Sequence, residues 1–202
     1  MQELFYEESA RIQDEKSASI KYNIFKTLSI ISYVLMCVWI VLAINAYILT
    51  GVWYIDLIFI AIPLVMFLFT GILLGKVKNK FYIDYDYTFV TGSIRIAKVI
   101  KNLKRKFVIK FDTSDIEKLG KYGSELYEKY SLMPGINKLI LTSNATPAED
   151  KDFYYIVVNN DGDKKLLIME CTQIFIINVI KFANKTVLDD EFRKELLTPK
   201  KK

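Results

Sequence analysis

The clearest pattern along the chain is a pair of long apolar stretches in its first half. Residues 27–55 contain no charged side chain, and neither does the stretch Leu57–Gly75. At 1.5 Å per residue the segments 28–49 and 57–75 reach about 33 Å and about 28 Å, against a hydrocarbon core of about 30 Å. The pattern therefore predicts two membrane-spanning helices, joined by the short connector 50–56 into a tight helical hairpin.

Two other interpretations of the first stretch are a cleaved signal peptide and a buried hairpin of a soluble protein. A signal peptide has an apolar core of about 7–15 residues behind a basic start. The stretch 28–49 is longer than that and follows a segment of mixed charge. The spanning helix accounts for both properties, so we expect two spans.

Basic residues flank the two predicted spans on one side only. Because cytoplasmic loops are enriched in Lys and Arg, and the connector 50–56 has none, both termini should lie in the cytoplasm. We therefore expect a multi-pass protein of the cell membrane. The basic residues are Arg11, Lys16, Lys21 and Lys26 before the first span, and Lys76, Lys78 and Lys80 after the second.

The segment 1–27 precedes the first span and is mostly polar. Residues 2–26 contain neither Pro nor Gly, so we expect a helix that continues into the span. Its apolar positions are too sparse for a continuous stripe, which favours a solvated juxtamembrane helix over one that binds a partner.

Beyond the spans the hydrophobic period changes from helical to two. In Phe81–Phe89, for example, apolar and aromatic residues alternate with Asp84, Asp86 and Thr88, as in a half-buried strand. Gly- and Asn-containing turns separate further segments of this kind. The seven predicted strands are 81–89, 94–100, 107–111, 116–119, 137–142, 153–159 and 164–171, with a tight turn at Asp161-Gly162.

The chain returns to a helical pattern after the last predicted strand. Thr172 can cap an apolar helix over 172–183, and a polar helix follows over 188–197. Seven meandering strands and one apolar helix suit a bent antiparallel barrel whose open end the helix covers. The fold class predicted is an α+β membrane protein: an N-terminal two-helix transmembrane hairpin, then a PH-like seven-stranded antiparallel β-barrel capped by a C-terminal helix. The predicted parts are 1–27, 28–75, 76–185 and 186–202, the last being a C-terminal helix and basic tail.

A resemblance supports this architecture. The stretch YIDYDYTFVTGSIRIAKVIKNLKRK (82–106), followed by FDTSDIEKL (111–119), resembles a family of small two-span membrane proteins of Gram-positive bacteria that carry a bacterial PH-like domain of unknown function. The shared features are acidic and Tyr residues, a Gly turn, an Ile-rich strand and a basic turn. The resemblance covers residues 1–185. Its motifs are structural, so it implies a fold and no active site.

Composition excludes much catalytic chemistry. The chain has no His and two Cys, at positions 37 and 171, so it has no imidazole base and no His-ligated metal. It also lacks the glycine-rich phosphate-binding motifs of nucleotide enzymes. We expect a protein that is not an enzyme and that carries no cofactor and no metal.

The segment 98–110 is the most distinctive candidate for a binding site. It reads KVIKNLKRKFVIK and contains six basic residues and no acid. On a membrane-tethered domain such a hairpin could contact anionic lipid headgroups, each basic residue contributing about 1 kcal/mol. The alternative is a solvated basic turn. No base-stacking motif accompanies it, so we expect no nucleic-acid partner. The candidate lipid- or partner-binding residues are Lys98, Lys101, Lys104, Arg105, Lys106 and Lys110.

Three further features are weaker candidates. The pair Asp84 and Asp86 resembles an acid/base pair, but exposed acids beside the basic neighbouring strand are the simpler interpretation. The segment 159–163 lacks the last ligand of a calcium loop and is interpreted as a hairpin turn. The apolar helix 172–183 could bind another protein.

Taken together, the sequence predicts a membrane-anchored cytoplasmic PH-like binding or scaffold module in contact with the lipid bilayer. Its ligand would be anionic lipid, a membrane protein partner or a second copy of the chain. A structural or accessory subunit of a larger membrane complex, and a membrane-embedded enzyme or transport component, are the alternatives.

Overall fold

The computed structural model describes residues 4–50, 53–160, 162–183 and 187–197. The chain divides into two compact units. The helical unit is Asp14–Tyr82, and the β unit combines Met1–Gln13 with Ile83–Lys202. The β unit is therefore discontinuous in sequence, because the helical unit is inserted between its first strand and the rest.

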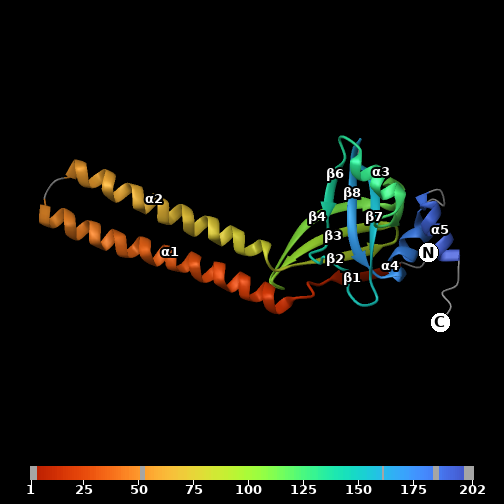
Figure 1. Ribbon diagram of the computed structural model, residues 1–202, viewed down its shortest axis with the longest axis horizontal. Coiled ribbons are helices and arrows are strands. Elements are labelled where there is room, and N and C mark those ends of the chain that lie inside the picture. The colour runs from red at the N-terminus through yellow and green to blue at the C-terminus, as the bar shows by residue number, and fades with distance from the viewer. Residues whose placement is uncertain (1–3, 51–52, 161, 184–186, 198–202) are drawn as a thin grey trace. The chain divides into compact units, whose positions relative to one another are not determined.

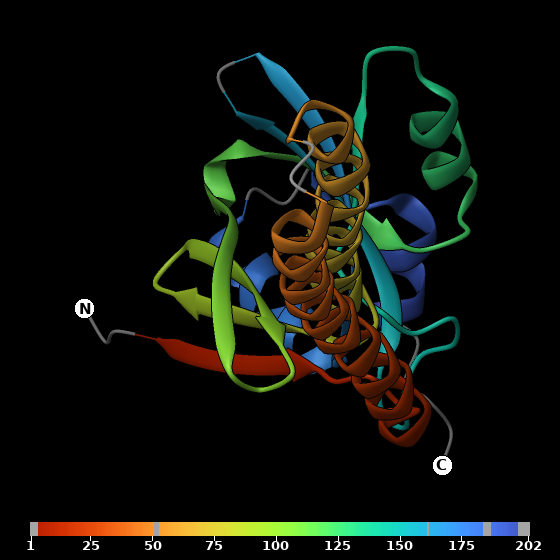
Figure 2. The same ribbon diagram turned by 90° about the vertical axis from the view of Figure 1, so that its left-hand side faces the viewer.

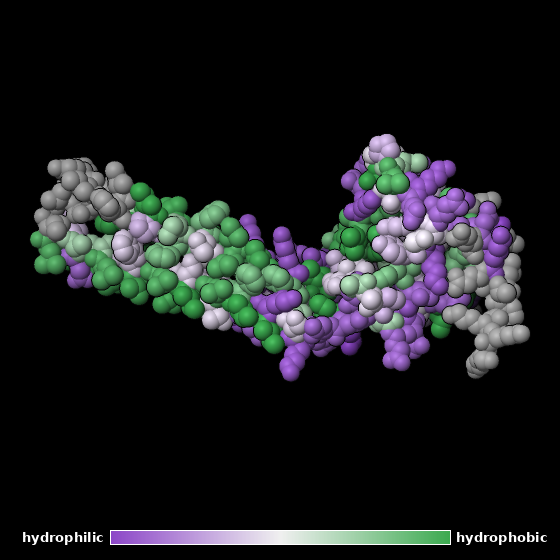
Figure 3. Space-filling view, in the orientation of Figure 1, coloured by the Kyte–Doolittle hydropathy of each residue, from purple (hydrophilic) through white to green (hydrophobic). Residues whose placement is uncertain are grey.

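Two long helices make up most of the helical unit. Helix α1 is Glu15–Thr50 and helix α2 is Trp53–Val77, followed by the 3-10 turn η1, Lys78–Lys80. The two helices lie side by side in both views (Figures 1 and 2). Apolar side chains predominate on the face of this hairpin seen in Figure 3. Both helices are long and apolar enough to cross a membrane by length and composition.

Small and hydroxyl side chains let the two helices approach closely. The hydroxyl of Ser29 donates to the carbonyl of Gly71 at 2.8 Å, and that of Ser32 donates to the carbonyl of Phe67 at 2.7 Å. A Cβ at Gly71 would lie 2.9 Å from the ring of Tyr33. Such contacts replace the hydrophobic effect as the cohesion between helices in an apolar solvent.

The β unit contains two sheets of four strands each among the described residues. Sheet A has the order β1-β2-β3-β4 and is antiparallel throughout, while sheet B has the order β5-β7-β8-β6. In sheet B, β6 runs parallel to β8. The strands are β1 Phe5–Ala10, β2 Ile83–Val90, β3 Ser93–Ile100, β4 Lys104–Asp112, β5 Ile116–Lys121, β6 Asn137–Ile140, β7 Asp152–Asn160 and β8 Asp163–Cys171.

The expected seven-stranded antiparallel barrel is therefore wrong in three respects. The sheets do not close into a barrel, the described strands number eight, and one pair is parallel. The parallel pair arises because residues 141–151 reverse the chain between β6 and β7, and the hairpin of β7 and β8 reverses it again. Of the turn predicted at Asp161-Gly162, Asp161 lies outside the described residues, and Gly162 has a φ of 88°.

The extra strand comes from the segment that was expected to be helical from its start. Residues Phe5–Ala10 pair antiparallel with β2, from Phe5 opposite Val90 to Ala10 opposite Tyr85. Period-two alternation explains this, since Tyr6 and Ala10 pack on the core while Phe5 is exposed. The helix prediction holds only from Glu15 onward.

The core of the β unit lies between the two sheets and one helix. Helix α4, Gln173–Phe182, is capped by the Thr172 hydroxyl as predicted, and its Phe175, Ile176 and Val179 are fully buried. The Phe175 ring centroid lies 6.0 Å from that of Tyr87 on β2. A short helix, α3 (Glu125–Leu132), lies between β5 and β6 in sequence, and α5 (Asp190–Leu197) ends the described chain. The predicted boundary at 185/186 and the tail Pro199–Lys202 lie outside the described residues.

A buried hydroxyl cluster fixes the segment before α5. The Asp189 carboxylate accepts from the Ser124 hydroxyl at 2.8 Å and from the Tyr155 hydroxyl at 3.1 Å. Burial raises the pKa of Tyr155, and the neighbouring Asp189 raises it further, so the phenol stays protonated and donates. The close fit extends to Gly120, where a Cβ would lie 2.7 Å from the Tyr155 ring.

The discontinuous β unit yields a first prediction. A shortened chain in which a flexible Gly-Ser linker replaces residues 14–82 should fold into a β-rich domain. The chain 83–202 alone should lose roughly 3–5 kcal/mol of unfolding free energy, because Tyr6 and Ala10 leave the core and β2 becomes an edge strand. Circular dichroism and urea unfolding measure both. Equal stability of the two chains would contradict the role assigned to β1.

Candidate functional site

The basic segment 98–110 forms the hairpin of β3 and β4. The Leu103 N–H donates to the Ile100 carbonyl at 3.0 Å, and the two residues between them, Lys101 and Asn102, have φ values of 48° and 56°. Positive φ at both central positions is the geometry of a type I′ turn, whose twist suits a hairpin. Leu103 stands at the tip with its side chain 83% exposed.

The six predicted basic residues do not form one patch, because strand alternation divides them. Arg105 faces away from the core, on the side of sheet A that carries Asp86. Lys98 and Lys106 are register partners across the hairpin, and Lys98 is opposite Tyr85, whose ring packs toward the core. Residues two apart on a strand share a face, so Lys104 lies with Lys106. The register shift between Ile96 and Ala97 places Lys110 on the other face with Arg95, its register partner, and Lys101 is in the turn.

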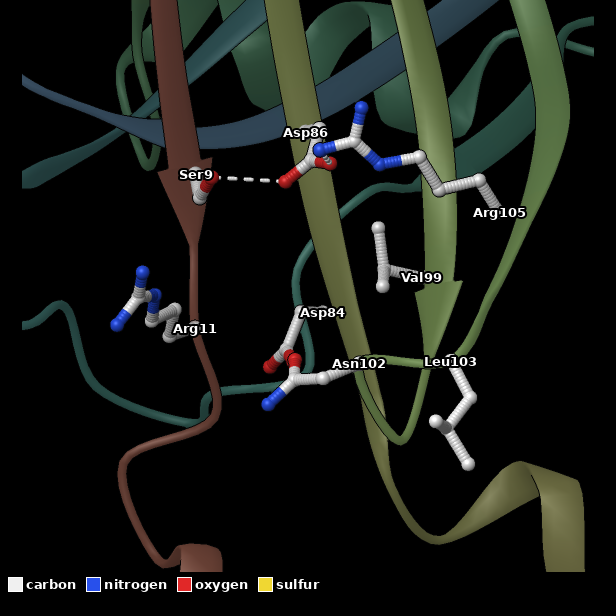
Figure 4. A pocket seen from close by; sticks show the side chains of 8 residues that line it. All are labelled: Ser9, Arg11, Asp84, Asp86, Val99, Asn102, Leu103 and Arg105. Atoms are coloured by element: carbon white, nitrogen blue, oxygen red, sulfur yellow. Dashed lines mark hydrogen bonds and ion pairs between the residues drawn. The ribbon is translucent and has the colours of Figure 1, made fainter.

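A pocket of about 330 Å³ opens on the face of sheet A that points away from the core (Figure 4). It lies entirely within the β unit. Its apolar lining is Val99 of β3 and Leu103 of the turn. Its polar lining comes from β1, the segment after it, β2, the turn and β4: Ser9, Arg11, Asp84, Asp86, Asn102 and Arg105.

Two carboxylates of β2 form the floor of this pocket. Asp84 is 5% exposed and Asp86 is 6% exposed, so the expectation that they are exposed acids is wrong. They are buried because β1 and the segment after it lie alongside β2. Asp84 accepts from the backbone N–H of Ile12 at 2.8 Å, and Asp86 accepts from the Ser9 hydroxyl at 2.7 Å. Both donors belong to a segment that was expected to be helical.

Arg105 closes the pocket at its β4 side. Its Nη2 lies 3.0 Å from Asp86 Oδ2 and 3.9 Å from Glu7. The contact with Asp86 is an ion pair without hydrogen-bond alignment, since the buried Oδ2 atom accepts no hydrogen bond. The Arg105 side chain is itself 70% exposed. Of the six predicted residues, Arg105 is the one that lines the pocket.

The loop between β6 and β7 holds the segment that follows β1. The Asn144 side chain donates to the Arg11 carbonyl at 2.8 Å and accepts from the Gln13 N–H at 2.9 Å. Gln13 in turn donates through its side chain to the Thr146 carbonyl at 2.8 Å. The amide of Asn144 thus pairs with the backbone of residues 11 and 13 as a neighbouring strand would, and it fixes the segment that carries Arg11 at the edge of the pocket.

Glu170 of β8 holds this loop in place. It has no exposed surface, and its carboxylate accepts hydrogen bonds from the Asn144 amide, the Thr142 hydroxyl and the backbone N–H of Ala148. Burial raises the pKa of the Tyr87 phenol well above its usual range, so Tyr87 stays protonated and donates to the Leu141 carbonyl at 2.6 Å. No local sequence motif indicates this network, because its members lie far apart along the chain.

The described residues contain no group of three or more His, Cys, Asp or Glu side chains placed to hold a metal ion. The two carboxylates of the pocket are matched by two guanidiniums from Arg11 and Arg105. The pocket lining therefore carries two acidic and two basic side chains.

The loop network yields a second prediction. Asn144→Asp replaces the amide donor by a carboxylate next to Glu170, and it should lower the free energy of unfolding by about 2 kcal/mol or more at neutral pH. The repulsion raises the folded-state pKa of the new carboxyl, so the electrostatic part of the loss should shrink as the pH falls through that raised pKa and should be gone below about 4, the unfolded-state value. Thermal unfolding against pH measures this. The matched change Asn137→Asp, at an exposed position of β6, should cost little, and equal losses would contradict the assignment.

Comparisons with known proteins place this architecture in a family. A family model described as a bacterial PH-like domain (DUF6106) matches residues 20–189, which include most of α1, all of α2, strands β2–β8 and α4. No curated protein and no solved structure matches the chain. The predicted resemblance to a bacterial PH-like family of unknown function is confirmed, and the chain belongs to the bacterial PH-like domain family DUF6106.

Proposed function

We propose that this protein is a membrane-anchored binding or scaffold module: α1 and α2 cross the cell membrane, and the β unit works on the cytoplasmic side, close to the lipid surface. The exposed apolar surface of the helical hairpin supports the proposal that it anchors the protein in the membrane. In the most apolar windows of the two helices, 17% and 6% of the residues are buried inside the protein. The core helix of a soluble protein is buried far more fully than this.

The pairing of β1 with β2 is the observation that carries the proposal. β1 precedes α1 and β2 follows α2, yet the two strands are paired over six residues. Two crossings return the chain to the side from which it started, so a sheet built from both flanks of the hairpin requires both flanks on one side. The basic residues around the hairpin favour the cytoplasm for that side.

One end of sheet A collects the features that suit a lipid surface. β1 ends there at Ala10 and is joined to α1 by residues 11–14, while β2 begins there and is joined to α2 through residues 78–82. Ile83 is the register partner of Ile100, so the turn with Lys101, Leu103 and Lys104 lies at the same end. An exposed leucine among lysines combines apolar insertion with attraction to anionic lipid.

A protein partner is the second source of contacts for this module. Ile174, Ile177 and Phe182 of α4 are exposed large apolar residues, and a membrane-tethered surface can engage a partner through weak contacts because its effective concentration is high. This supports the alternative of an accessory subunit in a larger membrane complex, or of a homo-oligomer.

Topology provides the third prediction. In a chain carrying Cys37→Ala and Cys171→Ala, Gly51→Cys should react with a membrane-impermeant maleimide added to intact cells, because it lies in the external connector. Leu103→Cys in the same background should react only after the cells are opened. The reverse labelling pattern would place the β unit outside the cell and refute the proposal.

Surface docking provides the fourth prediction. An environment-sensitive dye is attached to Leu103→Cys of the full chain, which is reconstituted in liposomes at physiological salt. Its emission should shift to the blue in liposomes rich in anionic lipid, and the shift should be smaller in neutral liposomes. Leu132→Cys is a matched control, since Leu132 is also 83% exposed but lies on α3. Equal emission from the two sites in both lipids would show that the turn does not touch the surface.

A further inference from the structure

The pocket on sheet A is electrically bipolar. Its floor consists of Asp84 and Asp86, both more than nine-tenths buried. In Figure 4 the guanidinium of Arg105 on β4 lies beside Asp86, while Arg11, in the segment after β1, lies at the other edge with its guanidinium turned away from the two carboxylates. With two acids and two guanidiniums the lining has no net charge. Such a site favours a small ligand that carries a cation and an anion close together over a purely anionic or purely cationic one.

The contact between Arg105 and Asp86 indicates where the cation of such a ligand would sit. Asp86 Oδ1 accepts from Ser9, whereas the buried Oδ2 atom has an ion-pair contact with Arg105 and no hydrogen bond. A buried carboxylate oxygen without a hydrogen bond is costly. Because the Arg105 side chain is 70% exposed, an ammonium group can take its place on Oδ2, and the guanidinium is then free to bind the anion of the same ligand.

We infer that this pocket binds the phosphoethanolamine headgroup of a membrane phospholipid, with its ammonium on the carboxylates of β2 and its phosphate between Arg105 and Arg11, whose exposed side chain turns inward to reach it. Guanidinium groups match phosphate oxygens in geometry and charge. The volume of about 330 Å³ is at the small end of ligand pockets and suits a headgroup.

The lining selects a primary ammonium over a quaternary one. A primary ammonium donates three hydrogen bonds, as a lysine does, and can supply the one that the Oδ2 atom of Asp86 lacks. The trimethylammonium of choline donates none, and sites for it are usually built from aromatic rings. The pocket lining contains no aromatic residue among the described ones. A phosphocholine headgroup should therefore leave the buried Oδ2 atom of Asp86 unsatisfied.

A lipid is the source that best fits the position of the pocket, an argument that rests on the proposed membrane function. Leu103 lines the pocket and is 83% exposed at the tip of the turn, so an apolar side chain stands beside the opening where acyl chains would leave it. Arg11 lies in the short segment 11–14 that joins β1 to α1.

The first arm of the test uses water-soluble headgroups and the full chain in an uncharged maltoside detergent. Glycerophosphoethanolamine should raise the Tm in proportion to the logarithm of its concentration once the site is saturated. Glycerophosphocholine and glycerophosphoglycerol at the same concentrations should not. An equal rise with the choline compound, or no rise with the ethanolamine compound, would overturn the inference.

Two substitutions test the assigned roles. Asp86→Asn keeps an acceptor for Ser9 but removes the charge that holds the ammonium. Arg11→Ala removes an exposed arginine and tests the phosphate contact even if Asp86→Asn fails to fold. Each should raise the half-saturating concentration of glycerophosphoethanolamine about tenfold or more. Arg95→Ala is the matched control, because Arg95 stacks on Phe107 on the same sheet but does not line the pocket. If Arg95→Ala weakened the binding of glycerophosphoethanolamine as much as Arg11→Ala does, the assigned site would be refuted.

The second arm separates a lipid from a free headgroup. The full chain is reconstituted in nanodiscs of phosphatidylglycerol with or without phosphatidylethanolamine, and co-purifying lipid is measured by native mass spectrometry. Retention of phosphatidylethanolamine, lost in Arg11→Ala, is expected. Binding of the soluble headgroup without retention of the lipid would overturn the lipid assignment. The dye on Leu103→Cys reports surface docking independently, so a failure in both arms with a retained dye shift refutes this inference and leaves the proposed function standing.

Discussion

The carboxylate of Glu170 lies in the interior of the β unit, surrounded by hydrogen-bond donors from one loop. A buried charge is tolerated only where such donors replace water. The conformation of the loop is therefore coupled to the position of Glu170 in β8. The loop in turn fixes residues 11–13 through Asn144. The position of Arg11, the burial of Asp84 and the pocket itself all depend on that chain of contacts, which begins at Glu170.

Much of the architecture could be predicted from hydrophobic period alone. Both long helices, the strands from β2 onward and the Thr172 cap follow from residues that are near in sequence. Strand β1 is harder to predict. The core-facing residues of this segment, Leu4, Tyr6 and Ala10, alternate only weakly with polar and acidic ones, and a helix with a sparse apolar face fits the same sequence. The strand conformation of this segment is determined by its pairing with the edge of β2, which is more than seventy residues away in the sequence. The direction of β6, parallel to β8, is likewise determined by the loop 141–151 and not by the four residues of the strand.

The candidate site shows a similar division. The sequence identifies the basic hairpin, but residues that are adjacent in a strand point to opposite faces. Arg105 consequently lines a pocket, whereas Lys104 and Lys106 on either side of it do not. Ser9 and Arg11 could be assigned to that pocket only once β1 was known to pair with β2. The two aspartates illustrate the same limit, because their alternation with core residues indicates that they face away from the core but not that another segment covers them.

The insertion of the helical hairpin between β1 and β2 has a consequence for how the protein is made. The ribosome completes β1 first, and this strand has no partner until the 72 residues from 11 to 82 have been synthesised and β2 follows. A flexible loop of that length is entropically costly to close, whereas a folded hairpin brings its two ends together. In the proposed topology, a chain in which one helix failed to cross would have β1 and β2 on opposite sides of the bilayer, and sheet A would lack its first strand. Under that topology, completion of the sheet would act as a check on membrane insertion, because a wrongly inserted chain would expose an open β edge to quality-control proteases.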